Sequence, residues 1–284
     1  MNKPQLPSDL VETVKHALAE DVGSGDITAQ LIAADTQAQT QVISREQAIL
    51  CGTAWFDEVF KQLNHQIQIT WHVQDGEIVS PNQKLCDLTG NARALLTGER
   101  TALNFLQLLS STATQVQQYV KAIDGTKTQI LDTRKTIPGL RQAQKYAVRC
   151  GGGTNHRMGL YDAFLIKENH IVAAGSITKA IATARHHTNQ LPIEVEVETL
   201  EQIKEALQAG TNRLLLDNFT LPQLREAVAL VQNQVKLEAS GGIMLESIRA
   251  IAETGVDFIS VGTLTKNVQA IDLSMRVQEI ANRI

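Results

Sequence analysis

The side chains best suited to chemistry follow six short apolar segments, at the point where each segment ends. Charged, amide and glycine residues are costly inside a fold unless they are paired or line a wet cleft. In parallel α/β folds, functional groups collect at the carboxyl ends of the strands. The pattern therefore predicts one composite site, built from residues 132–135, 167–169, 194–198, 217–218, 240–242 and 261–263.

The stretch from Asp132 to His170 reverses the charge of the rest of the chain. It holds seven Lys or Arg residues against three acids, whereas the whole protein has a net charge of −4. A local reversal of that size concentrates anions in one place. These cations stand next to glycines, a proline and strand ends rather than along one helical face. The stretch is therefore predicted to form the floor of a site for a highly anionic substrate.

Two glycine-containing turns follow the last two apolar segments. Ser240, Gly241 and Gly242 form one, and Val261, Gly262 and Thr263 form the other. Either turn alone is weak evidence, because glycines are common where a strand passes into a helix. Phosphate sites in α/β barrels favour the last strands, where backbone N–H groups can approach the anion. As a pair, the turns predict a phosphate cradle.

Carboxylates on neighbouring segments suggest a metal shared with the substrate. Glu194, Glu196 and Glu198 alternate with apolar residues and so share one face of a strand. That face is either a solvated edge or part of the barrel interior. In the second case Glu196 and Asp217 would form a hard-oxygen pair suited to Mg²⁺ held jointly with phosphates.

His156 and Arg157 follow a triple glycine. A lone histidine is more often structural than catalytic, but its guanidinium neighbour favours contact with an anion. No histidine pair has the spacing of zinc ligands. The sequence also lacks a GxSxG motif, a Walker-type loop and a Rossmann GxGxxG fingerprint.

The elements that must position these groups alternate between strand and helix from residue 128 onward. The strand cores are predicted at 129–134, 163–169, 193–198, 213–218, 236–242 and 257–263. Such alternation implies parallel strands joined by right-handed crossovers. Six units are fewer than the eight of a closed barrel, so an open α/β barrel is predicted, with a doubly wound sheet as the alternative.

The first part of the chain has a different pattern, typical of an α+β sandwich. Helices are predicted at 8–21, 53–63 and 91–122, the last with a kink or interruption near Ser110 to Thr114. Strands are predicted at 38–44, 66–73 and 84–89, where apolar and polar residues alternate. The predicted domains are therefore 1–112 and 113–270. The segment 271–284 can pack on the barrel or return to the first domain.

Composition excludes several classes of protein. A pI near 6.0 argues against nucleic acid as the main partner. No apolar run approaches the ~20 residues of a membrane span, and the first residues lack the apolar core of a signal peptide. The three cysteines are widely spaced without a CxxC pair, which is typical of reduced thiols. A cytoplasmic location is therefore predicted.

Seven motifs together resemble the quinolinate phosphoribosyltransferase family, in order from about residue 15 to the end. They begin at EDVGSGDIT (20–28) and end at DFISVGTLTKNVQAIDL (257–273). Between them lie GERTALNFLQLLSSTAT (98–114), the basic stretch LDTRK to KENH (131–170), EVEVETL (194–200), LLLDN (214–218) and SGGI (240–243).

The resemblance implies an N-terminal sandwich and an open six-stranded barrel. It implies the transfer of a phosphoribosyl group from phosphoribosyl pyrophosphate to quinolinate, with loss of CO₂, in NAD biosynthesis. The other products would be nicotinate mononucleotide and pyrophosphate, with Mg²⁺ as the cofactor.

The resemblance also assigns roles to individual residues. It implies a homodimer in which Arg100 reaches the partner's site, and it leaves assembly beyond the dimer open. Lys135, Glu196 and Asp217 would be catalytic, with the two acids at the ribose and metal and Lys135 towards the pyrophosphate. Arg141, Lys145 and Arg149 would lie on a helix surface or interface. The quinolinate and phosphate contacts would come from Arg100, Thr133, Arg134, His156, Arg157, Lys167, Ser240, Gly241, Gly242, Val261, Gly262 and Thr263.

Two alternatives stay open at this point. One is a protein of the same fold that acts on another pyridine carboxylate or is associated with molybdate transport. A nicotinate-using enzyme binds only one carboxylate, for which so many cations would be excessive. The other is a non-catalytic sugar-phosphate-binding barrel, which would need neither Arg100 nor the Glu196 and Asp217 pair.

Overall fold

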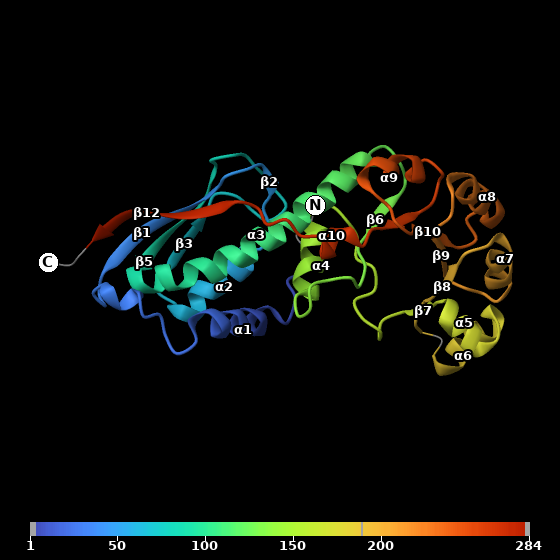
Figure 1. Ribbon diagram of the computed structural model, residues 1–284, viewed down its shortest axis with the longest axis horizontal. Coiled ribbons are helices and arrows are strands. Elements are labelled where there is room, and N and C mark those ends of the chain that lie inside the picture. The colour runs from blue at the N-terminus through green and yellow to red at the C-terminus, as the bar shows by residue number, and fades with distance from the viewer. Residues whose placement is uncertain (1–3, 189, 282–284) are drawn as a thin grey trace. The chain divides into compact units, whose positions relative to one another are not determined.

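The computed structural model describes residues 4–188 and 190–281, which form two compact units (Figure 1). The first, here called the sheet unit, contains the residues up to 117 together with 136–152 and those from 265 onward. The second, the barrel unit, contains residues 118–135 and 153–264. The predicted ranges 1–112 and 113–270 remain our proposal for the domains.

An antiparallel sheet of four strands, in the order β12-β1-β5-β3, organises the sheet unit. Its strands are β1 (Gln37–Ser44), β3 (Gln68–Trp71), β5 (Lys84–Asn91) and β12 (Leu273–Ala281), and β2 (Ala48–Ile49) pairs with β4 (Ile78–Val79). The helices are α1 (Leu10–Val22), η1 (Ala29–Leu31), α2 (Thr53–Leu63), α4 (Arg141–Cys150) and most of α3 (Ala92–Ala122). Strand β12 pairs with β1 along its length, so residues 273–281 lie in this unit, while 282–284 lie outside the described residues.

The core of the sheet unit lies between the sheet and its helices. Val42 and Leu88 of the sheet are fully buried, as are Phe56 and Phe60 on one side of α2. The Phe56 ring packs edge-on against Trp71 at 5.2 Å between centroids, an arrangement that aromatic quadrupoles favour. Burial of this apolar side fixes α2 at the predicted residues 53–63.

The long helix α3 continues through Ser110 to Thr114, so an interruption there is wrong, while a kink stays a prediction. The small side chains there serve close packing instead. The Ser110 hydroxyl accepts a hydrogen bond from Cys51 N at 2.9 Å, and Thr114 Oγ1 accepts one from Ile49 N at 2.8 Å. A Cβ added to Gly151 would lie 2.4 Å from the Ala113 carbonyl oxygen, so α4 ends close against α3.

Six parallel strands form the barrel unit, in the order β6-β11-β10-β9-β8-β7. The strands are β6 (Gln129–Leu131), β7 (Phe164–Ile166), β8 (Ile193–Val197), β9 (Arg213–Asp217), β10 (Lys236–Ser240) and β11 (Phe258–Ser260). From β7 to β11 the strands follow chain order without the reversal of a doubly wound sheet. Because β6 and β7 stand at the two ends of this order, the barrel is open. The predicted fold class is thereby confirmed.

Helices connect the parallel strands and leave the carboxyl ends of the strands free. They are α5 (Glu168–Ala174), α6 (Ile177–His187), α7 (Leu200–Gln208), α8 (Leu221–Val231) and α9 (Leu245–Ala252), and the short α10 (Thr263–Lys266) follows the last parallel strand, β11. In Figure 1, α7 and α8 lie to the right of β8 to β10, along the outside of the sheet. The connecting segments thus bring all six predicted strand ends to one edge.

Over the described part of the chain, none of the helices combines the length and apolar character needed to cross a membrane. The three cysteines are free thiols. The cytoplasmic location stays a prediction.

Candidate active site

A cavity of about 350 Å³ opens at the carboxyl ends of the barrel strands. Eight of its twelve lining residues were predicted from the sequence. They are Thr133, Arg134, Lys135, His156, Arg157, Lys167, Glu196 and Ser240. The other four are Leu165, Leu215, Glu238 and Ser260. The basic stretch and the acidic strand ends therefore meet in one place.

A buried carboxylate holds the loop that carries His156 and Arg157. Asp132, at the end of β6, is fully buried and accepts hydrogen bonds from His156 N at 2.8 Å and Asn155 Nδ2 at 2.7 Å. Thr154 forms a parallel bridge with Leu131 and so extends the sheet beside β6. The loop is thus fixed by Asp132, a predicted strand-end residue to which the sequence analysis gave no role of its own.

Two guanidinium groups converge on the floor of the cavity. Arg157 Nη1 donates to the Ala163 carbonyl at 3.2 Å, and Asp162 accepts from the backbone N–H of Met158 at 2.6 Å. Burial lowers the pKa of Arg157, and the nearby charge of Arg134 lowers it further. Two cations that repel one another in a half-buried floor favour the binding of an anion between them.

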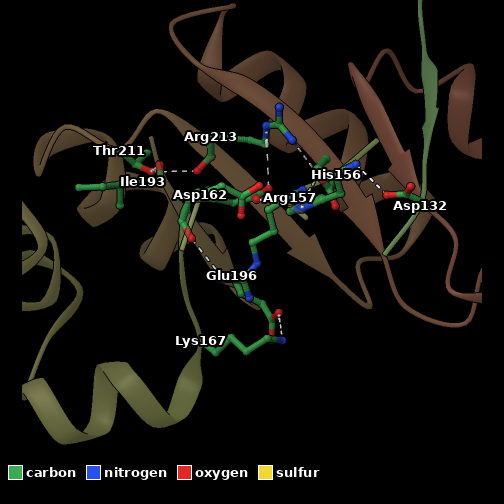
Figure 2. A network of polar contacts seen from close by, with 12 residues as sticks. Asp132, His156, Arg157, Asp162, Lys167, Ile193, Glu196, Thr211 and Arg213 are labelled. Carbon is green, nitrogen blue, oxygen red and sulfur yellow. Dashed lines mark hydrogen bonds and ion pairs between the residues drawn. The ribbon is translucent and has the colours of Figure 1, made fainter. Parts of the chain in front are cut away.

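Lys167 Nζ lies 2.5 Å from Glu196 Oε2 across the cavity (Figure 2). Burial raises the pKa of Glu196, and the charges of Asp217 and Glu168 add to the effect, while the hydrogen bond from Lys167 opposes it. Asp217 is thus close enough to Glu196 for its charge to act on that carboxylate, and a cation shared by the two stays a prediction. Asp217 itself does not line the cavity and accepts a hydrogen bond from Asn218 Nδ2 at 2.7 Å.

The two glycine turns lie at the same edge, although only Ser240 lines the cavity. A Cβ on Gly241 would lie 2.2 Å from Asn218 Oδ1, and the residue has φ +103°, so only glycine fits there. A Cβ on Gly262 would lie 3.0 Å from Lys135 Cδ. The Thr263 hydroxyl is buried without a hydrogen-bond partner among the described residues. A buried polar group left in this way suits a ligand oxygen.

A buried ionic cluster lies beneath the cations. His156 Nε2 lies 3.0 Å from Glu194 Oε2 and 3.4 Å from Glu238 Oε2, and Arg213 Nη1 lies 3.3 Å from Glu238 Oε2. The Arg213 guanidinium also stacks on the Phe258 ring at 4.4 Å. Figure 2 shows His156 and Arg213 side by side with Arg157. Paired in this way, the two buried glutamates avoid the cost of isolated charges.

The cluster sets the charge of His156. Burial alone would lower the pKa of His156, but its hydrogen bonds to Glu194 and Glu238 outweigh burial and raise the pKa to about 9. Burial raises the pKa of Glu194, and the charge of Glu238 adds to this. For Glu238, burial is outweighed by the hydrogen bond from His156, so its pKa is lowered.

Other predicted residues lie outside the cavity. Arg100 lies exposed on α3, in the sheet unit. On α4, Arg149 is exposed as predicted, but the expected surface position of Lys145 is wrong, because this residue is only 1% exposed.

The sequence also missed Glu238 and Arg213. Glu238 stands inside the apolar segment KLEAS, and a charged residue in such a segment was the one sign in the sequence that it has a buried partner.

Comparison with known proteins places both units within one family. A family model described as quinolinate phosphoribosyl transferase, N-terminal domain, matches residues 26–110, and the corresponding C-terminal domain model matches residues 112–276. A probable nicotinate-nucleotide pyrophosphorylase [carboxylating] of Bacillus subtilis is 43% identical over 94% of this chain and 93% of its own length. The nicotinate-nucleotide pyrophosphorylase [carboxylating] of Mycobacterium leprae is 42% identical over 93% of this chain and 95% of its own. A solved structure of the nicotinate-nucleotide pyrophosphorylase from Francisella tularensis is 51% identical, with a TM-score of 0.94 over 96% of this chain and 98% of that one.

Proposed function

This chain belongs to the quinolinate phosphoribosyltransferase family, and from that premise we propose that it transfers a phosphoribosyl group to quinolinate and releases CO₂. The resemblance of the seven sequence motifs to this family is thereby confirmed. The substrates implied by the family are quinolinate and phosphoribosyl pyrophosphate. The products would be nicotinate mononucleotide, CO₂ and pyrophosphate, in the biosynthesis of NAD.

The observation that carries this proposal is the convergence of Arg134 and Arg157 on the floor of the cavity. Quinolinate is a planar dicarboxylate, and guanidinium groups bind carboxylates through two parallel hydrogen bonds. Binding of the substrate would relieve the repulsion between the two cations. Lys167 would contribute a third cation by exchanging its contact with Glu196 for a substrate carboxylate.

His156 supports this floor from below. Both ring nitrogens already have partners, since Nε2 faces Glu194 and Nδ1 accepts a hydrogen bond from Arg157 N at 2.7 Å. The neutral ring holds Arg157 in place through Nδ1, whereas the protonated ring would give up that contact and add positive charge beneath the dicarboxylate. Direct contact between His156 and quinolinate stays a prediction.

The transferred ribose would lie near Glu196 and Asp217. Transfer develops positive charge at the ribose anomeric carbon, and nearby carboxylates stabilise such charge. The two acids offer the hard oxygen atoms that Mg²⁺ prefers, and Mg²⁺ usually takes its remaining ligands from substrate phosphates and water. When bound, Mg²⁺ would neutralise the departing pyrophosphate. Lys135, the most exposed of the four lining cations, would act on the same leaving group.

The 5-phosphate would occupy the cradle formed by Ser240 to Gly242 and Val261 to Thr263. Support comes from the buried Thr263 hydroxyl, which has no partner in the described part of the chain, and from Gly241, where only glycine fits. Lys135 lies beside Gly262 and could contact both phosphate groups.

Loss of CO₂ then follows from the chemistry of the product ring. Once its nitrogen carries ribose, the pyridine is cationic and stabilises the electron pair that stays on the adjacent ring carbon when its carboxylate leaves as CO₂. That carbon then takes up one proton from water. No side chain has to act as a nucleophile. The contribution of the chain is to position the substrates and to stabilise charge.

We further propose that the active assembly is a homodimer in which Arg100 completes the partner's site. The proposal is supported by the exposure of Arg100 on α3 and by the family resemblance of the GER segment that contains it. An exposed arginine contributes little to the stability of its own helix, so this position is available for binding.

The activity is tested with quinolinate labelled in the carboxylate next to the ring nitrogen. We expect labelled CO₂ only when phosphoribosyl pyrophosphate and Mg²⁺ are both present, with equal amounts of pyrophosphate. Consumption of nicotinate in place of quinolinate would identify an enzyme for another pyridine carboxylate. Binding of phosphoribosyl pyrophosphate without turnover of either compound would contradict the proposal and indicate a non-catalytic barrel.

A further inference from the structure

The sheet unit contains a second cluster of potential ligands, formed by Cys51, Asp75 and Cys150. One ligand atom from each residue lies within 4.8 Å of the other two. Two sulfur ligands of one tetrahedral Zn²⁺ lie roughly 3.8 Å apart, given a Zn–S bond of about 2.3 Å. The three groups are therefore close enough to bind one ion after small side-chain movements. Sequence spacing could not reveal the cluster, because its members come from three distant segments.

Each member of the cluster is held by its surroundings. The Ser110 hydroxyl accepts a hydrogen bond from Cys51 N at 2.9 Å and donates one to Cys51 O at 3.1 Å. Cys51 is fully buried, and Cys150 is the last residue of α4. Ser110 thus fixes the backbone of Cys51, and α4 fixes that of Cys150.

The Asp75 carboxylate is oriented from two sides. Its Oδ1 accepts hydrogen bonds from the backbone N–H groups of Gly52 and Thr53, both at 3.1 Å. Its Oδ2 accepts one from the Tyr146 hydroxyl at 2.8 Å, and the Tyr146 ring packs on Trp55 at 5.2 Å between centroids. Outer partners of this kind are typical of metal sites, where they orient the ligand.

The chemistry of the cluster suits a cation. Two thiols and a carboxylate lie within 4.8 Å of one another, and Cys51 is fully buried. A divalent cation favours the thiolate forms and binds the carboxylate.

We propose that Cys51, Cys150 and Asp75 bind a thiophilic divalent cation of the Zn²⁺ class, with Tyr146 positioning Asp75. Thiolates select Zn²⁺ over Mg²⁺, so this site is chemically distinct from the oxygen pair of Glu196 and Asp217. Three protein ligands leave a fourth position for water. The ion ties together the segment before α2, the turn at Asp75 and the end of α4.

The site would act on the stability of the sheet unit. An ion that binds only the folded chain raises the free energy of unfolding in proportion to the logarithm of its concentration. Cys150 is followed directly by Gly151 to Gly153, the start of the loop that continues to His156. Loss of the ion would therefore free one end of that loop.

The test uses the full-length reduced protein and Co²⁺ as a spectroscopic probe for the Zn²⁺ site. We expect one equivalent of Co²⁺ to give a thiolate-to-metal charge-transfer band in the near ultraviolet, and Zn²⁺ to displace the Co²⁺.

Cys150→Ser should abolish the band, and Asp75→Asn should weaken Co²⁺ binding. The matched control is Cys86→Ala, which removes the third thiol, in β5, and should keep the band. Tyr146→Phe should keep the band but weaken binding about 10-fold, because Asp75 loses its outer partner.

Several results would overturn the proposal. One is the absence of a charge-transfer band when titration of the denatured protein counts all three thiols. Another is a band that survives Cys150→Ser or disappears equally in Cys86→Ala. A single reactive thiol in the denatured, unreduced protein, with no Co²⁺ binding, would identify a Cys51–Cys150 disulfide instead. None of these readouts depends on catalytic activity, so they do not bear on the transferase proposal.

Discussion

The Nδ1 atom of His156 accepts a hydrogen bond from the backbone N–H of Arg157 at 2.7 Å. An Nδ1 that accepts a hydrogen bond carries no proton, so the contact belongs to the neutral ring with its proton on Nε2. Glu194 and Glu238 favour the cationic ring instead and raise the pKa of His156 to about 9. Protonation of Nδ1 would break the contact with Arg157 N. The charge of His156 is therefore coupled to the position of the Arg157 backbone.

The substitution Glu238→Gln should lower the pKa of His156 from about 9 towards its ordinary value of 6.5. It removes one of the two carboxylates that favour the cation and also breaks the pair with Arg213. We expect kcat/KM for quinolinate to fall roughly 10- to 100-fold, the usual effect of losing one charged hydrogen bond. NMR titration of labelled histidine measures the pKa, and Glu253→Gln, in an exposed pair with Arg249, is the control. An unchanged titration of His156 would contradict this assignment.

The same shift makes stability depend on pH. Because the pKa of His156 is raised in the folded chain, the stabilisation is complete below about pH 6.5 and is lost as the pH rises through about 9. The contribution is at most about 3 kcal/mol, since each pKa unit corresponds to about 1.36 kcal/mol. Urea unfolding of the wild type and His156→Gln should therefore differ most near pH 6 and least near pH 10. A difference that grows with pH would show the opposite sign.

Mixed dimers test whether Arg100 acts on the partner's site. Arg100→Ala and Lys167→Ala should each be inactive alone. In an equal mixture of the two, half of the dimers are hybrids with one intact site each, so about a quarter of wild-type activity should return. The control mixture is Lys167→Ala with Glu196→Gln, two residues that line one cavity, and it should stay inactive. A mixture of the first pair that stays inactive over a range of ratios would place Arg100 in the site of its own chain.

Asp217→Asn should lower kcat about 10²- to 10³-fold while leaving the KM for quinolinate unchanged. The carboxylate would act on the ribose cation and Mg²⁺, and loss of one such charge-stabilising group typically has this effect. The matched control is Asp257→Asn, at the opposite end of the sheet, whose carboxylate pairs with Lys236 at 2.8 Å. Steady-state rates over a range of Mg²⁺ concentrations give kcat and the KM for quinolinate of each variant. A rise in the KM for quinolinate alone would place Asp217 at the pyridine instead.

The architecture was predictable because the apolar segments of the barrel unit are short, regular and separated by helical patterns. All six predicted strand cores contain one strand of the parallel sheet. Parallel strands bring their carboxyl ends to one edge, so the sequence alone groups the residues that follow each strand. The predicted assignments of roles within that group stay predictions.

The residues that sequence reasoning missed are polar side chains whose partners are distant in the chain. Glu238 meets His156 and Arg213, and Asp132, predicted only as a strand-end residue, contacts residues more than twenty positions away. Cys51 and Cys150 looked unrelated because spacing rules describe local motifs. The wrong interruption of α3 has a similar cause, since small residues mark close helix packing as well as helix ends.

Gly262→Ala should weaken the binding of phosphoribosyl pyrophosphate by displacing Lys135. The new Cβ would lie 3.0 Å from Lys135 Cδ and 3.6 Å from Thr133 Oγ1, so the flexible lysine has to move. We expect the KM for phosphoribosyl pyrophosphate to rise roughly 10-fold, the effect of losing one charged hydrogen bond, with little change for quinolinate. A double-mutant cycle with Lys135→Ala isolates the cause, because neighbouring residues that act together are not additive. If the methyl group acts through Lys135, Gly262→Ala adds nothing to Lys135→Ala. Additive losses would show that the turn contacts the substrate independently of the lysine.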